Sequence, residues 1–327
     1  MLLGLVFALG GLAVLTVAAE HFIRGAARIA VAKQVSPVVV GAVLIGFGTS
    51  APEMVVSGIA AGRDDLDIGV GNIIGSNVAN ISLVLAAAAS VVAIPVSSST
   101  IRREVPISVA SVVVFALLVQ GEVTRVEGAL LALLVAMFLY VALRAGAGGD
   151  TSFDDDVSDL VGDEPFHFRY EVLRALNGLA FIVAASWFIV DGAERIAQAL
   201  DLSGGFVGFT LVALGTSAPE LVTSVQAARH GETELLVGNL LGSNVFNSLA
   251  VGGIIGLVGP GPVLDTRLAE TGSLMMVAIA VVSALFMMVG GKVGRAKALV
   301  LFFMWVVSVV MLSGGEDEVA AAAVLVG

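Results

Sequence analysis

The sequence GTSAPE at residues 48–53 recurs as GTSAPE at residues 215–220, and GNIIGSNVAN at residues 71–80 recurs as GNLLGSNVFN at residues 238–247. Both pairs are 167 residues apart, so the spacing between the two motifs is the same in each copy. Each copy places one glutamate, with several hydroxyl and amide side chains, inside apolar sequence. An ionisable group in a transmembrane segment is costly and usually functional. The duplication therefore predicts a cation site shared between the two halves of a transporter.

The composition around these motifs is that of a polytopic membrane protein. Of the 327 residues, 58% are hydrophobic and only 13% are charged, with a mean hydropathy of +1.03. Such values exclude a soluble domain. Apolar runs long enough to cross a bilayer core of about 30 Å number ten, five in each half, at 2–19, 37–62, 68–94, 105–120, 126–143, 172–190, 204–228, 235–258, 270–290 and 296–313. The predicted fold class is an all-α membrane protein.

The basic residues predict how these spans are oriented. When successive loops are assigned to alternate sides, twelve Lys and Arg residues fall on one side and four on the other. The basic side is expected to be cytoplasmic, which places both termini outside a plasma membrane. Because each half has an odd number of spans, the second half enters the membrane with opposite polarity. We therefore expect an inverted repeat, with a first five-helix repeat at 1–145, an acidic cytoplasmic linker at 146–165 and a second five-helix repeat at 166–327.

The motifs are expected to break the membrane helices near the midplane. Pro52 has no N–H and interrupts the helical hydrogen bonds of its own turn, and Gly46 weakens the same region. Freed carbonyl oxygens are tolerated at this depth only where they line a cavity. Gly71 and Gly75 are expected to break the third span in the same way. Each half then offers a carboxylate, hydroxyl groups, an amide and freed backbone oxygens.

All of these groups are hard oxygen donors, which suit Ca²⁺ and Na⁺. The chain has no cysteine and neither motif has a histidine, so zinc and copper are poor candidates. Glu53 and Glu220, brought together by the inverted symmetry, would give a site of charge −2 that one Ca²⁺ or two Na⁺ neutralise. Carrying the empty site through a dehydrated state would leave two unpaired carboxylates, at a cost of several kcal/mol. This favours obligatory exchange over leak.

The paired motifs resemble the alpha-repeats of the sodium/calcium exchanger family, within the calcium:cation antiporter superfamily. The resemblance covers essentially the whole chain. The chain is similar to the prokaryotic members of the family, which have no cytoplasmic regulatory domain. It implies that Ca²⁺ is bound by Glu53 and Glu220 with the backbone oxygens of Thr49 and Thr216. It also implies flanking Na⁺ sites and a central position built from Ser50, Ser76, Ser217, Ser243, Asn80, Asn247 and the carbonyls of Gly46 and Ala213. The long first and sixth spans would slide against the rest to alternate access.

Asn247 departs from part of the family pattern, because some archaeal exchangers and the potassium-dependent branch carry an aspartate there. Asparagine keeps an acceptor oxygen without the charge, which is compatible with Na⁺/Ca²⁺ exchange and argues against K⁺ dependence. The other motif asparagines have two readings: they line the site, or they only cap broken helix ends. These residues are Asn72, Asn77, Asn239 and Asn244.

The expected function is an electrogenic Na⁺/Ca²⁺ antiporter working by alternating access. A Ca²⁺/H⁺ antiporter of the same superfamily, with the glutamates as proton carriers, is the nearest alternative, and a cation channel is a more distant one. An intramembrane hydrolase is disfavoured because Ser50 and Ser217 have no His or Lys base at a plausible depth. We therefore expect no enzyme activity, no cofactor, no nucleic acid and no obligatory protein partner, with the lipid bilayer as surroundings and Ca²⁺ and Na⁺ as transported ions.

Overall fold

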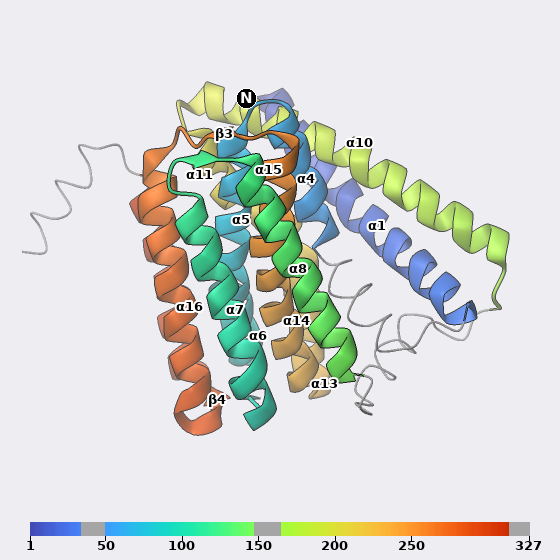
Figure 1. The fold of residues 1–327 in the computed structure, drawn as a ribbon, viewed down its shortest axis with the longest axis vertical. Coiled ribbons are helices and arrows are strands. Elements are labelled where there is room, and N and C mark those ends of the chain that lie inside the picture. Colours follow the sequence, from blue (N-terminus) through green and yellow to red (C-terminus); the bar gives the residue numbers. More distant parts are fainter. Residues whose placement is uncertain (34–49, 147–164, 314–327) are drawn as a thin grey trace, which may run out of the picture.

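The computed structural model describes residues 1–33, 50–146 and 165–313, which are mostly helical. Figure 1 shows an upright bundle of helices with two longer helices leaning against it at an angle. Of the predicted linker at 146–165, the structure describes only Gly146 and Pro165. Two residues of the predicted site, Gly46 and Thr49, also lie outside the described residues.

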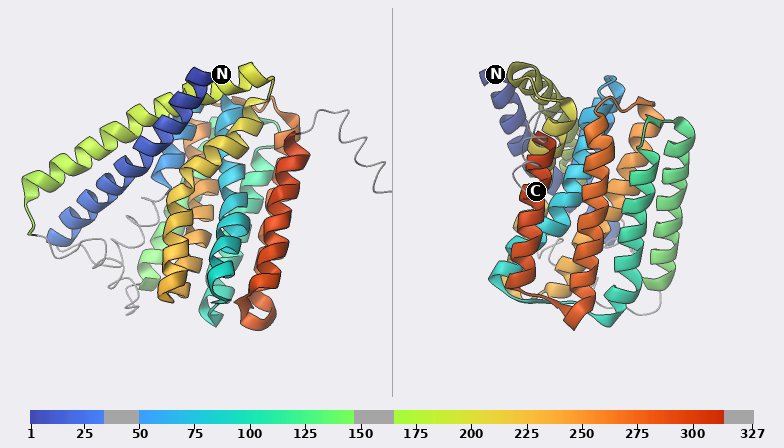
Figure 2. Two further views of the ribbon diagram at one scale, coloured as in Figure 1. Left: turned by 180° about the vertical axis from the view of Figure 1, so that it is seen from behind. Right: turned by 90° about the vertical axis from the view of Figure 1, so that its left-hand side faces the viewer.

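The two leaning helices, α1 (Leu2–Ala32) and α10 (Phe168–Leu200), run side by side (Figures 1 and 2). At 1.5 Å per residue, the 31 residues of α1 extend for about 46 Å, which exceeds the membrane core of about 30 Å. Glycines bring the two backbones together. A Cβ atom on Gly192 would lie 2.5 Å from the amide nitrogen of Ala8, and one on Gly178 would lie 2.6 Å from that of Phe22. Only glycine fits at such distances.

The bundle contains the remaining helices of both halves. From the first half come α4 (Ala51–Gly62), α5 (Leu66–Ala79), the π-helical turn η2 (Asn80–Val84), α6 (Leu85–Val91), β1 (Ile94–Pro95), α7 (Ser98–Leu118), β2 (Glu122–Val123) and α8 (Arg125–Gly146). From the second half come α11 (Gly204–Val207), η3 (Gly208–Val212), α12 (Ala213–Thr216), α13 (Ala218–His230), α14 (Thr233–Val245), η4 (Phe246–Val251), α15 (Gly252–Val258), β3 (Gly261–Pro262), η5 (Leu268–Gly272), α16 (Ser273–Met288), the 3-10 turn η6 (Val289–Gly291), β4 (Lys292–Val293) and α17 (Arg295–Ser313). The pairs α4 and α13, α5 and α14, α6 and α15, and β1 and β3 each begin 167 residues apart. The sequence repeat is thus also a structural repeat.

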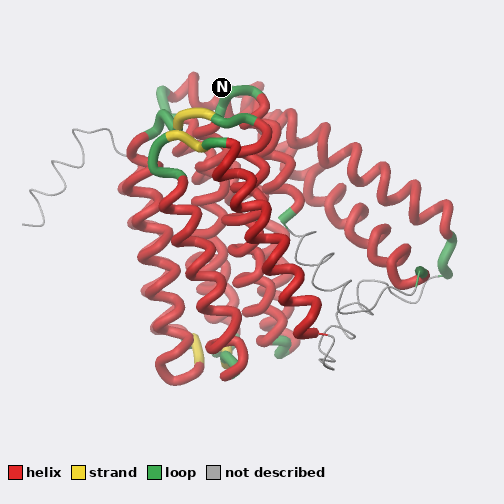
Figure 3. Tube along the Cα trace, viewed as in Figure 1, coloured by secondary structure: helices red, strands yellow, loops and turns green. Residues whose placement is uncertain are grey.

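Two short antiparallel sheets join the halves at opposite ends of the bundle (Figure 3). At one end β1 pairs with β4, with Ile94 opposite Val293. At the other end β2 pairs with β3, with Glu122 opposite Pro262. The equivalent strands β1 and β3 therefore lie at opposite ends of the molecule, although they occupy the same place in the two copies of the repeat.

Several helices are long and apolar enough to cross a membrane. Within the described residues six meet this condition, at Leu2–Ala32, Leu66–Val91, Phe168–Leu200, Leu236–Val258, Leu268–Gly291 and Arg295–Ser313. The bent pair Gly204–Thr216 and Ala218–Arg229 makes a seventh if it is one span. The protein is therefore of the helical membrane type, and this count alone does not reach the ten spans expected from the sequence.

The expected break of the third span at Gly71 and Gly75 is wrong. The helix α5 continues through both positions, and its hydrogen-bonding pattern changes only at η2. A Cβ atom on Gly71 would lie 2.3 Å from the carbonyl oxygen of Gly205, and one on Gly75 would lie 2.2 Å from that of Phe209. These glycines therefore allow the second half to pack closely on α5 rather than interrupting it.

Candidate ion-binding site

The predicted break at the GTSAPE motif is present in the second half. There α12 ends at Thr216 and α13 begins at Ala218, and the helical segments Gly204–Thr216 and Ala218–Arg229 are bent by 46°. Pro219 has no N–H, so the carbonyl of Gly215 loses its helical donor. In the first half, Pro52 likewise occupies the first turn of α4, and Ser50 precedes that helix. Both motifs therefore start a helix inside the protein.

The two glutamates lie in the first turns of these helices. Glu53 in α4 and Glu220 in α13 are each 1% exposed. The first turns of the two helices meet, because the hydroxyl of Ser217, three residues before Glu220, lies 3.3 Å from Oε1 of Glu53. The N-terminal end of a helix stabilises negative charge within its first turn. The fold thus brings one carboxylate from each half into the same buried interior, as the sequence predicts.

Hydroxyl groups from both halves lie close to Glu53. The hydroxyl of Ser217 donates a hydrogen bond to Oε1 of Glu53 over 3.3 Å. Thr216 and Ser76 also lie beside this carboxylate. Because Ser217 and Thr216 belong to the second half, the break in α12 and α13 is held against the first half at this point.

A chain of asparagines joins the halves deeper in the bundle. Nδ2 of Asn80 donates to Oδ1 of Asn244 over 3.2 Å, and Nδ2 of Asn244 donates to the carbonyl of Asn77 over 3.2 Å. Nδ2 of Asn77 in turn donates to the hydroxyl of Ser248 over 3.0 Å. Asn77 and Asn244 are equivalent residues of the two copies, so the halves meet here around their motif asparagines. These side chains link helices and do more than cap helix ends.

Several buried oxygen atoms have no hydrogen-bond partner in the described part of the chain. They are Oε2 of Glu53, Oε2 of Glu220, the hydroxyl of Ser50, and Oδ1 of Asn80 and Asn247. Buried polar atoms are nearly always paired, because leaving one unpaired costs about 1–3 kcal/mol. All five atoms are acceptors of the kind that Na⁺ and Ca²⁺ bind. Both halves contribute to the set, so the arrangement suits a cation between them.

The remaining predicted residues are also buried. Ser243 and Ala213 are both fully buried, and Ser217 is 3% exposed. The carbonyl of Ala213 accepts a hydrogen bond from the amide of Ser217 over 3.0 Å, and the hydroxyl of Thr216 lies 3.3 Å from it. One of its lone pairs is therefore used within the helix, and the other is left for a ligand.

One buried polar residue beside the site, Ser57, is not among the candidates predicted from the sequence. Ser57 lies one helical turn after Glu53, and the structure joins it to Asn72 through a hydrogen bond of 2.9 Å. A signal was available, because Ser224 stands at the same distance after Glu220 in the second copy. Serine is common in membrane helices, so this repetition alone was easily overlooked.

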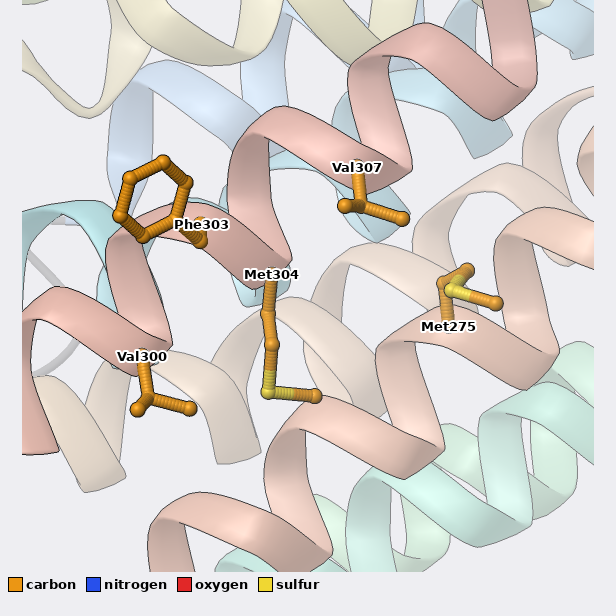
Figure 4. Close-up of a pocket in the computed structure, with 5 residues that line it drawn as sticks. All are labelled: Met275, Val300, Phe303, Met304 and Val307. Carbon is orange, nitrogen blue, oxygen red and sulfur yellow. The ribbon is translucent and has the colours of Figure 1, made fainter. Parts of the chain in front are cut away.

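A groove on the surface of the bundle is unrelated to this chemistry. It lies between α16 and α17, has a volume of about 290 Å³ and is lined by the apolar side chains of Met275, Val300, Phe303, Met304 and Val307 (Figure 4). Phe303 is 61% exposed, as expected for a side chain that faces lipid. The groove offers no ligand for an ion.

Comparison with known proteins assigns the chain to a family. The model of the sodium/calcium exchanger protein family matches residues 3–144 and 171–314. CaxA of Alkalimonas amylolytica is 36% identical over 299 residues, which cover 90% of this chain and 93% of the relative. The sodium/calcium exchanger MaX1 of Methanosarcina acetivorans is 28% identical over 347 residues, which cover 95% of this chain and 97% of the relative.

A solved structure gives the same result. The sodium-calcium exchanger NCX_Mj, soaked with 2.5 mM Na⁺ and 0.1 mM Ca²⁺, superimposes with a TM-score of 0.66 at 27% identity, covering 96% of this chain and 100% of that one. The motif pairs, the buried glutamates and these matches agree. The chain is a member of the sodium/calcium exchanger protein family.

Proposed function

We propose that this protein is an antiporter that couples Na⁺ influx to Ca²⁺ extrusion by alternating access, and that it is electrogenic. The observation that carries this proposal is the pair Glu53 and Glu220, one from each half, both 1% exposed and each with an unpaired carboxylate oxygen among the described residues. Two buried carboxylates need about two positive charges. One Ca²⁺ or two Na⁺ supply them, and a third Na⁺ on the flanking oxygens would make the exchange electrogenic.

The proposed ligands follow from the same site. Glu53 and Glu220, with the backbone oxygens of Thr216 and its counterpart Thr49, would bind Ca²⁺. Ser50, Ser76, Ser217, Ser243, Asn80 and Asn247 would complete the Na⁺ shells and the central position, with the carbonyls of Gly46 and Ala213 as further ligands. The protein then needs no cofactor and catalyses no covalent reaction. Its substrates are the two ions, and it works in the lipid bilayer without an obligatory protein partner.

The proposed architecture is ten membrane helices in two inverted repeats, 1–145 and 166–327, joined by the segment 146–165. The bundle helices of the second repeat begin 167 residues after those of the first, which supports the repeat. The equivalent strands β1 and β3 lie at opposite ends of the bundle, which supports the inversion. Helices α1 and α10, which lean against the bundle as a pair, would be the elements that move.

The proposed orientation places the β1–β4 end in the cytoplasm of a plasma membrane, with both termini outside. Basic side chains gather around that end, on β4 and near the N-terminal ends of α7 and α17: Arg102, Arg103, Lys292, Arg295 and Lys297. The β2–β3 end has fewer of them: Arg63, Arg125 and Arg267. The positive-inside rule associates the end that is richer in Lys and Arg with the cytoplasm.

The test is ⁴⁵Ca²⁺ uptake into proteoliposomes loaded with Na⁺ and diluted into Na⁺-free buffer. Uptake by the wild type should require internal Na⁺, and Glu53→Gln should abolish it because the site loses one of its two charges. Glu122→Gln is the matched control, since this glutamate is exposed in β2 at the end of the bundle. It should transport like the wild type.

The possible outcomes separate the functions. Uptake that ignores Na⁺ but follows a pH gradient would replace the proposal with Ca²⁺/H⁺ antiport, in which the two glutamates carry protons. Uptake that needs neither gradient would indicate a channel. Normal Na⁺-driven uptake by Glu53→Gln would refute the assignment of the central carboxylate.

A further inference from the structure

A relay of three hydrogen bonds connects the helix break of the second half to the interior of the first. The hydroxyl of Thr216 donates to Oδ1 of Asn72 over 3.1 Å. Nδ2 of Asn72 donates to the hydroxyl of Ser57 over 2.9 Å, and the hydroxyl of Ser57 donates to the carbonyl of Gly69 over 3.3 Å. Thr216 is 1% exposed, and Ser57 and Asn72 are fully buried. The relay crosses from α12 to α5 and then to α4 before it ends on the backbone of α5.

The relay can run in only one direction. The carbonyl of Gly69 has no proton, so Ser57 must donate its single proton there. Ser57 can then only accept from Asn72, and this fixes the amide of Asn72 with its oxygen toward Thr216. Asn72 presents a bare acceptor, so Thr216 must donate. Its second acceptor, the carbonyl of Ala213, is farther away at 3.3 Å.

This direction decides what Thr216 offers to the site. Its hydroxyl lies beside the carboxylate of Glu53. The shortest hydrogen bond that this hydroxyl donates goes to Asn72, so the relay holds the hydroxyl proton on the side of α5 and leaves the oxygen lone pairs available to a cation beside Glu53. The hydroxyl of Ser217, the next residue, donates to Oε1 of Glu53. The two adjacent hydroxyl groups at this helix break thus have different hydrogen-bond partners.

We propose that Ser57 and Asn72 are positioning residues, which hold Thr216 at the helix break with its hydroxyl oxygen available to the transported cation. This inference rests on the proposed function, since it needs a cation next to Glu53. It adds two residues of the first half whose effect on ion affinity is exerted only through Thr216.

The second copy of the repeat supplies a natural comparison. Ser224 and Asn239 are the counterparts of Ser57 and Asn72. In the described part of the chain, the hydroxyl of Ser224 and Oδ1 of Asn239 have no hydrogen-bond partner. The hydrogen bonds of the relay are therefore formed at Ser57 and Asn72, and the matching atoms of Ser224 and Asn239 do not form them. A serine-to-alanine change at these two positions removes the same atom, but it breaks the relay in only one case.

The experiment measures ⁴⁵Ca²⁺ affinity of the purified full-length protein in detergent, together with its unfolding temperature. The variants are Ser57→Ala and Asn72→Leu, with Ser57→Thr to retain the hydroxyl and Ser224→Ala as the matched control. Losing one buried hydrogen bond of about 1–1.4 kcal/mol corresponds to binding that is about five- to tenfold weaker. We expect this loss for Ser57→Ala and Asn72→Leu, recovery with Ser57→Thr, and less than a twofold change for Ser224→Ala.

Other results would overturn the proposal. If Ser57→Ala lowers the unfolding temperature but binds Ca²⁺ within twofold of the wild type, the relay is structural only. If Ser224→Ala weakens binding as much as Ser57→Ala, the assembled relay has no special role. Should Asn72→Leu not fold, the comparison of Ser57→Ala with Ser57→Thr decides. If the wild-type protein binds Ca²⁺ but shows no Na⁺-driven uptake, the proposed Na⁺/Ca²⁺ exchange is refuted. The comparison of Ca²⁺ affinities among the relay variants then still tests the role of Ser57 and Asn72.

Discussion

Replacing Gly192 by alanine tests the close packing of α1 against α10. The new Cβ atom would lie 2.5 Å from the nitrogen of Ala8, 2.7 Å from the oxygen of Gly4 and 3.0 Å from the Cα of Ala8. All three are backbone atoms, so no side chain can turn away. Ordinary contact begins at 3.4 Å, and the helices must therefore separate locally by about 0.9 Å. Overpacking of this kind costs about 1–3 kcal/mol, against a gain of about 1 kcal/mol because alanine favours a helix more than glycine.

Gly10→Ala is the matched control, because a Cβ atom at Gly10 in α1 would meet nothing within 4 Å. It should receive the helix gain without the clash, so that Gly192→Ala is less stable than Gly10→Ala by about 1–3 kcal/mol. The assay is thermal unfolding in detergent followed by tryptophan fluorescence, for which Trp187 in α10 is a local probe. If Gly192→Ala unfolds at or above the temperature of Gly10→Ala, the two backbones do not approach as closely as the structure has them.

Two further predictions concern charged groups. Burial raises the pKa of Asp65, and the nearby charges of Glu194 and Asp67 raise it further. The contribution of Asp65 to stability is therefore present below the pKa of the unfolded chain and is lost as the pH rises through the pKa of the folded protein. Asp65→Asn keeps an acceptor for the amide of Ile68. In thermal unfolding, this variant should unfold at a higher temperature than the wild type at pH 8, and the difference should become smaller towards pH 4. A difference in unfolding temperature that grows on acidification would contradict this reasoning. Arg28 and Glu171 form a buried ion pair of 2.9 Å between α1 and α10, and Arg174 lies 3.7 Å from the other oxygen of Glu171. Arg28→Met should therefore destabilise, but by less than the about 3–5 kcal/mol expected when a buried carboxylate loses its only partner. Adding Glu171→Leu should recover much of this loss in a double-mutant cycle of thermal unfolding, and a purely additive result would argue against the pair.

The sequence was sufficient for the bent helix of the second half and for the burial of one glutamate from each half. Proline removes a hydrogen-bond donor wherever it stands, and a glutamate within apolar sequence indicates a buried functional group. The same reasoning failed at Gly71 and Gly75. Glycine lowers helix propensity and also permits close contact, and only the position of the opposing backbone shows which property is used.

The hydrogen-bond relay at Thr216 could not be predicted from the sequence, for a different reason. Thr216 and Asn72 are 144 residues apart, and their hydrogen bond depends on how the second half packs on α5. The π-helical turns that begin at Asn80 and just before Asn247 were also not predicted. Such turns change the direction in which a side chain points and are frequent at functional sites, but no residue type marks them.

The crossed strand pairs bear on the ancestry of the molecule. Each half supplies one strand to each end, and each strand finds its partner only in the other half. A single half would leave both of its strands as open edges, which proteins avoid. A separate half could pair its strands in this way only with a second copy turned end over end, so that strands at opposite ends of the bundle meet. If the halves are inverted in the membrane, as we propose, an ancestor made of single halves would have had to insert its two copies in opposite topologies.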